Sequence, residues 1–498
     1  MDDEKNDHAT STPSGPNLTA SDGTASDETD SNPATSNPAA SGEGASPGSG
    51  PGLQRSLKDR HMRMIALGGI IGASLFIGSG AVINTVGPAA VLSYAIGGVI
   101  VVLVMRMLGE MAAAAPTLGS FMEYARSSLG NWAGFTVGWL YWYFWVGVVA
   151  FESVAGARLL QPLLPAVPQW VLSLALLLLL TATNLISVRS FGEAEFWLAS
   201  IKVLTIVVFL VVGALFVLGA WPSATFSVPN IARDGFAANG GFSVIHGVVL
   251  VIFSYFGTEI VTIVSSETDR PEKAVARATA TTVWRVLLFY VGSVALLVMI
   301  TPWRDIPSDT SPFAAAFDRF GLPAAGVVMN AVVFTAALSV LNSGLYTASR
   351  MLFALRERGF APSWIRDVNS RGVPWKAIVC STLVGYVAVA MSYVAPDTIF
   401  YFIINSAGAV AMFVYALIAL SQLRMRRAIE ATEPERLKLR MWLFPYLTWA
   451  TLVAIVAVVA TMAVIPDSRS QLLLSMVSLA AILTIYALFV RPRTLRSS

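Results

Sequence analysis

Twelve apolar stretches, each of about 20 residues or more, follow one another along this chain. A helix needs about 20 predominantly apolar residues to cross the hydrocarbon core of a bilayer. The pattern therefore predicts an all-α polytopic membrane protein with twelve transmembrane helices. The predicted spans are 63–85, 89–111, 131–160, 168–188, 195–220, 241–266, 281–302, 323–355, 374–394, 398–422, 441–465 and 470–490.

Composition agrees with this fold class and excludes several functions. The chain is 55% hydrophobic and 13% charged, whereas soluble proteins average about 25% charged residues. The single cysteine, Cys380, excludes an intramolecular disulfide, and the three histidines form no cluster with it. No nucleophile–base arrangement, phosphate loop or metal-ligand set is visible, so we expect no enzyme, no metal and no cofactor.

Both ends of the chain differ from the apolar part. Residues 1–54 carry nine acidic residues and one lysine and contain no aromatic residue, so we expect a disordered tail. It lacks the features of a signal peptide. Residues 55–492 form the predicted membrane domain, and residues 493–498 follow as a short C-terminal segment.

Lysines and arginines between the predicted spans are distributed unequally. Twenty-six lie on one side of the predicted membrane and five on the other. The positive-inside rule therefore places both termini in the cytoplasm. The basic run Arg424–Arg427 belongs to this bias, so we expect no nucleic-acid partner.

Small residues interrupt the first predicted span at Gly68–Gly80. Glycine weakens helices, and backbone groups freed within a membrane must face protein, water or a ligand. The interruption predicts a broken helix near the midplane, as in small-molecule transporters. The alternative for an isolated segment of this kind is close packing between helices.

A second interruption, Phe253–Glu259, lies in the sixth predicted span. Spans one and six each open a block of five spans, and they enter from opposite sides. This arrangement predicts inverted repeats over 63–220 and 241–422, followed by two extra helices within 441–490. Helix N-termini suit a carboxylate, and freed carbonyls suit an ammonium, so the expected substrate is a zwitterion.

Three charged residues lie within the predicted spans: Glu152, Lys202 and Glu259. A charge in the centre of a span costs at least about 2.5 kcal/mol. Lys202 either exchanges a proton during transport or extends its ammonium to the membrane surface. Glu259 can accept a substrate amine, carry a proton or pair with Lys202, and Glu152 can form an ion pair with Arg158.

Several sequence stretches resemble the bacterial amino acid permeases of the amino acid–polyamine–organocation superfamily, most closely the gamma-aminobutyrate (GABA) permeases. The resemblance covers about residues 53–492. It rests on Leu57–Arg63, Gly72–Phe76, Met105–Met111, Gly138–Trp142, Gly192–Trp197, Glu259–Ile263, Pro271–Lys273, Leu341–Arg350 and Ser421–Arg426.

This resemblance implies a LeuT-type fold that works by alternating access in the bacterial cytoplasmic membrane. It implies that the substrate carboxylate lies on the first break and the amino group faces the second. A span-five lysine, here Lys202, is implied to couple transport to protons, with the backbone near Gly69 and the side chain of Ser339 as neighbours. The implied substrate-binding residues are Gly72, Ala73, Ser74, Phe253, Ser254, Tyr255, Phe256, Gly257 and Glu259.

The substrate is inferred from the same resemblance. Relatives specific for α-amino acids often have Thr-Gly where this chain has Ala73-Ser74. We therefore expect proton symport of GABA or a similar small amino acid. One alternative is transport of another amino acid, such as proline, an aromatic or another α-amino acid, or amino acid exchange. Another alternative is a receptor that binds amino acids without transport. Asn405 departs from the aspartate expected in close relatives. The implied partners are the substrate, protons and the lipid bilayer, and the sequence assigns no oligomeric state.

Overall fold

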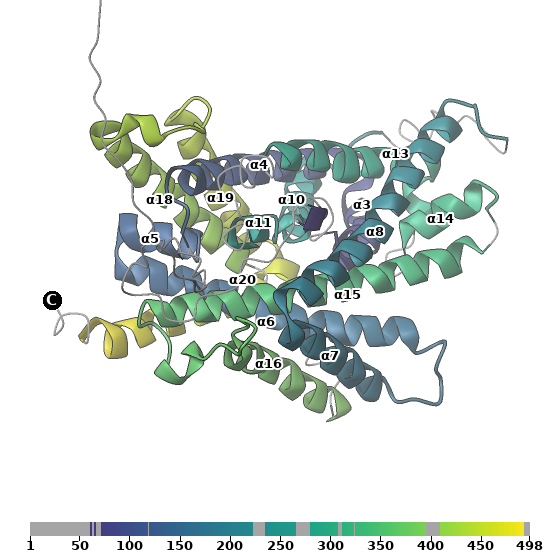
Figure 1. The fold of residues 1–498 in the computed structure, drawn as a ribbon. Helices are drawn as coiled ribbons and strands as arrows, with labels where there is room; N and C mark the ends of the chain where they lie inside the picture. The colour runs from purple at the N-terminus through teal and green to yellow at the C-terminus, as the bar shows by residue number, and fades with distance from the viewer. Residues whose placement is uncertain are drawn as a thin grey trace, which may run out of the picture. The chain divides into compact units, whose positions relative to one another are not determined.

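In the computed structural model, the residues whose placement is described are 60–61, 64–65, 71–117, 119–222, 235–264, 279–306, 311–322, 324–394 and 409–492. They all belong to one structural unit, Pro51–Ser498. Their regular secondary structure is entirely helical (Figure 1). The acidic tail, Gly69 and Asn405 lie outside the described residues.

Nine helices in the described part of the chain are long and apolar enough to cross a membrane. One of them, Ser74–Ala114, combines the later part of the predicted first span with the second span. The predicted ninth span corresponds to a shorter apolar helix, Trp375–Met391. The first part of the predicted tenth span lies outside the described residues, and helix α18 (Val410–Thr432) covers the rest. The described part of the chain is thus all-helical, and the chain is a multi-pass membrane protein.

The fifth predicted span begins too late. Helix α8 runs from Val188 to Val217, whereas the apolar stretch begins at residue 195. Ser187 forms the N-cap, because its side chain accepts a hydrogen bond from the backbone N–H of Ser190 at 3.0 Å. The earlier start places Glu195 and Lys202 on the same helix.

Helices α6 (Asn131–Leu160) and α15 (Ala325–Glu357) pack against each other over a large area. Small residues permit this close approach. A Cβ atom added at Gly138 would lie 2.5 Å from Cδ2 of Leu355, and one added at Gly344 would lie 2.8 Å from Cε3 of Trp145. Small residues at a helix interface are typical of membrane bundles, where packing replaces the hydrophobic effect as the driving force.

Two further groups of helices surround this pair (Figure 1). Helices α7 (Gln169–Ile186) and α16 (Trp375–Val394) pack against α6 and against each other. Helix α4 (Ala90–Ala114) packs against α10 (Gly241–Tyr255), α18 and α19 (Tyr446–Val464). Helix α8 contacts α15, and this contact positions the lysine described below.

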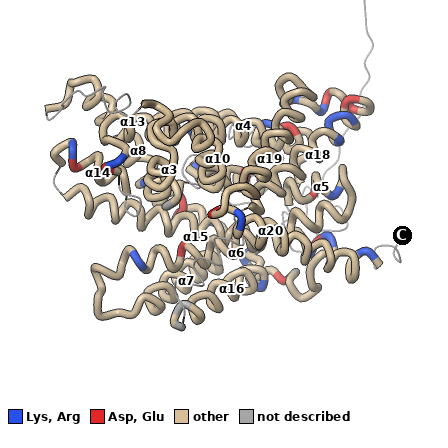
Figure 2. Tube along the Cα trace, turned by 180° about the vertical axis from the view of Figure 1, so that it is seen from behind, with Lys and Arg blue, Asp and Glu red and all other residues tan. Residues whose placement is uncertain are grey.

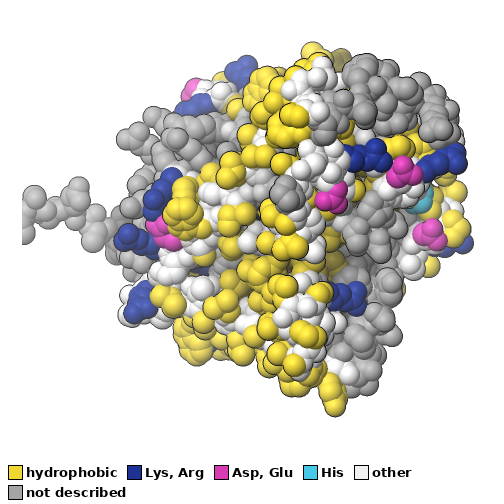
Figure 3. Space-filling view, turned by 90° about the vertical axis from the view of Figure 1, so that its right-hand side faces the viewer, with side chains coloured by type: hydrophobic (Ala, Val, Ile, Leu, Met, Phe, Trp, Pro, Cys, Tyr) yellow, Lys and Arg dark blue, Asp and Glu magenta, His cyan; other side chains and the backbone are white. Residues whose placement is uncertain are grey.

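The surface has the apolar character expected of a protein in lipid. Charged residues are sparse along the chain, and several gather near α5 (Phe121–Leu129) and α18 (Figure 2). One face carries a broad area of hydrophobic side chains (Figure 3). Leu204 and Val211 of α8 are 64% and 55% exposed. Exposed apolar side chains over an extended area mark a membrane-facing surface.

Candidate functional site

The first span is interrupted before Ala73. Ile71 and Gly72 are buried and non-helical, and α2 (Ala73–Phe76) and α3 (Gly78–Val86) follow them. The Leu75 N–H donates to the carbonyl of Gly72 at 3.2 Å, so Gly72 makes the first hydrogen bond of the new helix. The side chain of Ser74 is partly buried.

The second break is shorter than the sequence predicts. Helix α10 continues through Phe253, Ser254 and Tyr255, and the non-helical part begins at Phe256 and ends before α11 (Ile260–Val264). Phe256 is extended, with φ −65° and ψ 137°. Gly257 has φ +105°, a region that only glycine adopts without strain. The backbone therefore leaves the helix at Phe256 and turns at Gly257, and the polar residue Ser254 remains helical.

The two breaks lie next to each other. The Ser254 hydroxyl donates a long hydrogen bond of 3.4 Å to the carbonyl of Ser74. Aromatic rings surround Phe256: its centroid is 4.3 Å from that of Phe144 and 5.3 Å from that of Tyr415. The site therefore combines polar backbone at two interrupted helices with an aromatic wall from α6 and α18.

Glu259 is fully buried and stabilises the second break. Its two carboxylate oxygens accept hydrogen bonds from the Gly257 N–H at 3.0 and 3.2 Å. The Tyr415 hydroxyl donates to Oε2 at 3.2 Å. A carboxylate that accepts a backbone N–H satisfies a donor freed by the break. The hydrogen bonds of Lys202, described next, go to other groups, so the structure does not bring Glu259 and Lys202 together as a hydrogen-bonded pair.

Lys202 of α8 is fully buried beside the first break. Its Nζ donates to the carbonyl of Ile71 at 2.7 Å and to the hydroxyl of Ser339 at 2.7 Å. The ammonium thus connects non-helical backbone next to Gly72 with α15. It does not extend to the membrane surface. Gly69, the other expected neighbour, is not among the described residues.

Glu195 is the member of this site that sequence reasoning missed. It is fully buried, and its Oε1 accepts a hydrogen bond of 2.5 Å from Ser339. Asn342 Nδ2 donates to Oε2 at 3.3 Å, and Asn184 Nδ2 donates to Asn342 Oδ1 at 2.9 Å. One signal was available in the sequence: Glu195 precedes Lys202 by seven residues, a spacing that places both on one face of a helix.

Glu152 lies on α6 and is also buried, with 6% of its surface exposed. It interacts electrostatically with Lys202. Its Oε2 has no hydrogen-bond partner within the described part of the chain. Three ionisable side chains from α6 and α8 therefore share one buried region.

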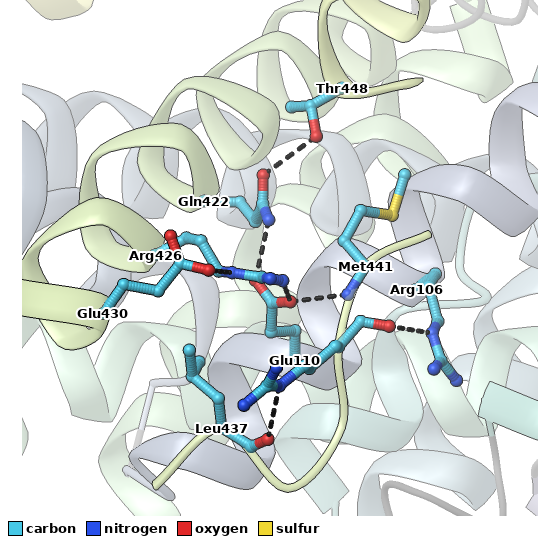
Figure 4. A network of polar contacts seen from close by, with 9 residues as sticks. Arg106, Glu110, Gln422, Arg426, Glu430, Leu437, Met441 and Thr448 are labelled. Atoms are coloured by element: carbon cyan, nitrogen blue, oxygen red, sulfur yellow. Dashed lines mark hydrogen bonds and ion pairs between the residues drawn. The ribbon is translucent and has the colours of Figure 1, made fainter. Parts of the chain in front are cut away.

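A second buried polar network connects α4 to α18 and α19 (Figure 4). The Glu110 carboxylate accepts hydrogen bonds from Gln422 Nε2 at 2.7 Å and from the Met441 N–H at 2.5 Å, and it forms an ion pair with Arg426. Thr448 donates to Gln422 at 3.0 Å. Arg426 was expected in a basic loop, but α18 continues to Thr432 and buries it.

Comparison with known proteins relates this chain to transporters. The sequence model described as "Amino acid permease" matches residues 61–496. A gamma-aminobutyric acid permease of Bacillus subtilis is 50% identical over 440 residues, which cover 88% of this chain and 94% of that protein. A protein of the same name from Escherichia coli is 42% identical and covers 84% and 90%.

Two further similarities are more distant. The aromatic amino acid transport protein AroP of Corynebacterium glutamicum is 39% identical over 429 residues, which cover 85% of this chain and 92% of that protein. A crystal structure of a manganese transporter mutant from Eremococcus coleocola has a TM-score of 0.51 at 13% identity, covering 85% of this chain and 91% of that one. At this identity the likeness concerns the fold alone.

Proposed function

Because this chain belongs to the amino acid permease family, we propose that it is a secondary transporter that imports GABA, or a similar small amino acid, together with protons. The substrate assignment is supported by the relatives named GABA permease at 42% and 50% identity. The proton coupling is supported by one observation above all: the buried Lys202 ammonium bonds the backbone beside the first break.

The substrate is proposed to lie between the two breaks. Its carboxylate binds the backbone at Gly72, Ala73 and Ser74, where freed N–H groups favour an anion. Its amino group faces the backbone of Phe253–Gly257. Glu259 already accepts hydrogen bonds from Gly257 and Tyr415. We therefore assign it to shaping the second break and not to binding the amine directly.

Lys202 is proposed to couple protons to this site. Hydrogen bonds from charged groups contribute about 1.5–3 kcal/mol, roughly twice a neutral bond. Loss of the Lys202 proton would therefore weaken the attachment of the Ile71 carbonyl, which adjoins Gly72. A change in protonation is in this way transmitted to the backbone that receives the substrate carboxylate.

The proposed membrane topology has twelve spans, with inverted repeats over 63–220 and 241–422 and two additional helices within 441–490. Both termini lie in the cytoplasm, and the protein is located in the cytoplasmic membrane. The nine candidate spans, the shorter helix Trp375–Met391 and the interruptions of spans one and six support this topology. Alternating access then exposes the two breaks to each side in turn.

The direct test is uptake of labelled GABA by proteoliposomes of purified protein, with and without an inward proton gradient. We expect concentrative uptake only with the gradient. Accumulation without a gradient, driven by internal amino acid, would make the protein an exchanger. No uptake of GABA in either condition would refute the substrate assignment.

Another amino acid is the second candidate, and the similarity to AroP favours an aromatic one. The rings of Phe144, Phe256 and Tyr415 also line the region of the second break. Competition separates the two candidates: excess phenylalanine or tryptophan should leave GABA uptake unchanged if GABA is the substrate. Strong inhibition by either would favour the aromatic assignment.

A further inference from the structure

We infer that Glu195 is the group that receives the Lys202 proton, with the Ser339 hydroxyl as the relay between them. This inference rests on the proposed proton symport and adds two residues to its pathway. All three side chains are fully buried, so bulk water does not compete for the proton at this point.

The hydrogen-bond directions fit a relay. Ser339 Oγ accepts from Lys202 Nζ at 2.7 Å and donates its own proton to Glu195 Oε1 at 2.5 Å. A hydroxyl is both donor and acceptor, so it can receive one proton and release another, and it is neutral again after the transfer. Lys202, Ser339 and Glu195 thus form one continuous hydrogen-bonded path, which leads from the lysine beside the first break to the glutamate near the start of α8.

The transfer is balanced in atoms and charge. One Nζ–H bond of the Lys202 ammonium breaks, and its proton bonds to Ser339 Oγ. The original hydroxyl proton of Ser339 passes to Oε1 of Glu195. The ammonium becomes an amine, the carboxylate becomes a carboxylic acid, Ser339 is unchanged, and nothing is oxidised or reduced.

The second carboxylate oxygen of Glu195, Oε2, bonds an amide and not an ionisable group. Asn342 donates to Oε2, and Asn184 in turn donates to Asn342. Neither amide accepts a proton in this pH range, so neither takes the proton from the carboxylate. Among the described residues, the other ionisable group that interacts electrostatically with Lys202 is Glu152 of α6. The ammonium of Lys202 and the carboxylates of Glu152 and Glu195 together carry one net negative charge. Because a buried net charge is costly, this region favours uptake of a proton.

Glu195 also lies on the exit side under the proposed topology. It is seven residues closer than Lys202 to the start of α8, which is about 10 Å along a helix. The start of α8 faces the cytoplasm in that topology. Transfer from Lys202 to Glu195 therefore moves the proton inward and neutralises the lysine that bonds Ile71.

Two variants test the relay: Glu195→Gln removes the proton acceptor, and Ser339→Ala removes the relaying hydroxyl. Thr335→Ala is the matched control, because it removes a hydroxyl from α15 that, among the described residues, bonds the carbonyl of Val332 in the same helix. Proteoliposomes are assayed for GABA accumulation under a proton gradient, for acidification of a luminal pH dye, and for counterflow of labelled against unlabelled GABA.

We expect both test variants to lose gradient-driven accumulation and GABA-dependent acidification on the order of a hundredfold or more, the range for loss of a positioned acid–base group. Counterflow, which needs no net proton release, should remain close to that of the wild type. Thr335→Ala should match the wild type in all three assays.

Other results would overturn the relay. If Glu195→Gln accumulates GABA and acidifies the lumen like the wild type, Glu195 is not the acceptor, while proton symport itself stands. If accumulation and counterflow fall equally and the melting temperature falls with them, the residues are only structural. If the wild type transports GABA without any proton, the relay and the proposed coupling both fail.

Discussion

Two buried charges, Lys202 and Glu259, serve different parts of the same site. The lysine bonds the carbonyl of Ile71 and the hydroxyl of Ser339, on two separate elements. The glutamate bonds Gly257 within its own break and Tyr415 of α18. An ionised group inside a membrane protein is retained where such partners offset its desolvation. The lysine is the better candidate for a mobile proton, because its partners include a second ionisable group through Ser339.

Replacement of Lys202 tests its role directly. Lys202→Ala should abolish proton-driven accumulation of GABA. Counterflow should stay measurable, because the two helix breaks proposed to bind the substrate are still present. The measurement is uptake with and without a pH gradient, with Ser200→Ala as a control on the same helix, where the hydroxyl donates to the backbone carbonyl of Phe196. Unchanged proton-driven uptake in Lys202→Ala would remove this residue from the mechanism.

Ser74 is expected to limit substrate width next to the carboxylate. Ser74→Gly should widen the first break and increase inhibition of GABA uptake by α-amino acids about tenfold or more, because a methylene in a pocket changes binding by about 1–3 kcal/mol. Competition profiles measure this effect. Thr85→Ala, whose hydroxyl bonds Ala81 O of its own helix, is the control. An identical profile in Ser74→Gly would show that Ser74 does not set selectivity.

At the level of helices, glycine contacts and a buried ion pair hold the elements in place. Gly138 and Gly344 permit α6 and α15 to approach closely, and Glu110 joins α4 to α18. The contact between α6 and α15 is apolar and depends on shape. The contact between α4 and α18 depends on charge, because Glu110 and Arg426 are both almost fully buried.

A methyl group at Gly138 should disturb the contact between α6 and α15. In Gly138→Ala the new Cβ would meet Leu355 at 2.5 Å and Met122 at 3.0 Å, so both side chains must move. We expect a loss of stability of about 1–3 kcal/mol, seen as a lower melting temperature. Gly326→Ala on α15, where the added methyl has open space, should be neutral or slightly stabilising. Equal melting temperatures for the two variants would contradict the close contact.

The Glu110 network should matter for stability more than for substrate binding. Glu110→Gln leaves the Arg426 charge less compensated, and loss of one partner of a buried pair costs about 3–5 kcal/mol. Thermal unfolding should show this loss, while KM for GABA stays near that of the wild type. Glu430→Gln removes the more exposed partner of the same arginine and should cost about 1 kcal/mol or less. A smaller effect for Glu110→Gln than for Glu430→Gln would refute the proposed importance of Glu110.

At the level of the whole chain, the two interrupted spans are adjacent although 180 residues separate Ser74 from Ser254. Inverted repeats with an even number of spans would explain how two distant breaks meet at one site. The proposed topology then requires both termini on the cytoplasmic side.

Tag accessibility tests this topology. Epitope tags at residue 1 and after residue 498 should both be cleaved by protease in inside-out vesicles and both be protected in intact spheroplasts. A tag within the segment between α8 and α10 should show the opposite pattern. Opposite accessibility of the two termini would exclude an even number of spans.

Much of the fold follows from local properties of the sequence. Long apolar stretches predict the membrane-spanning helices, because burial of apolar side chains in lipid requires only length and composition. Glycine marks both breaks in the sequence, because it weakens a helix, and at Gly257 the backbone has φ +105°, which favours glycine. The ends of helices are harder to predict from the sequence. Hydropathy marks the boundary of the lipid, whereas helix α8 begins earlier, at the N-cap Ser187.

The partners of the buried charges were decided only by tertiary structure. Ser339 is 137 residues from Lys202 and 144 from Glu195, and Arg426 is 316 residues from Glu110. Hydropathy identifies such charges as unusual but carries no information about which helices pack together. That choice depends on the fit of whole helix surfaces, such as the glycine contacts of α6 and α15. The sequence by itself thus determined the membrane helices, their breaks and the family, and helix packing alone placed Ser339 of α15 between Lys202 and Glu195.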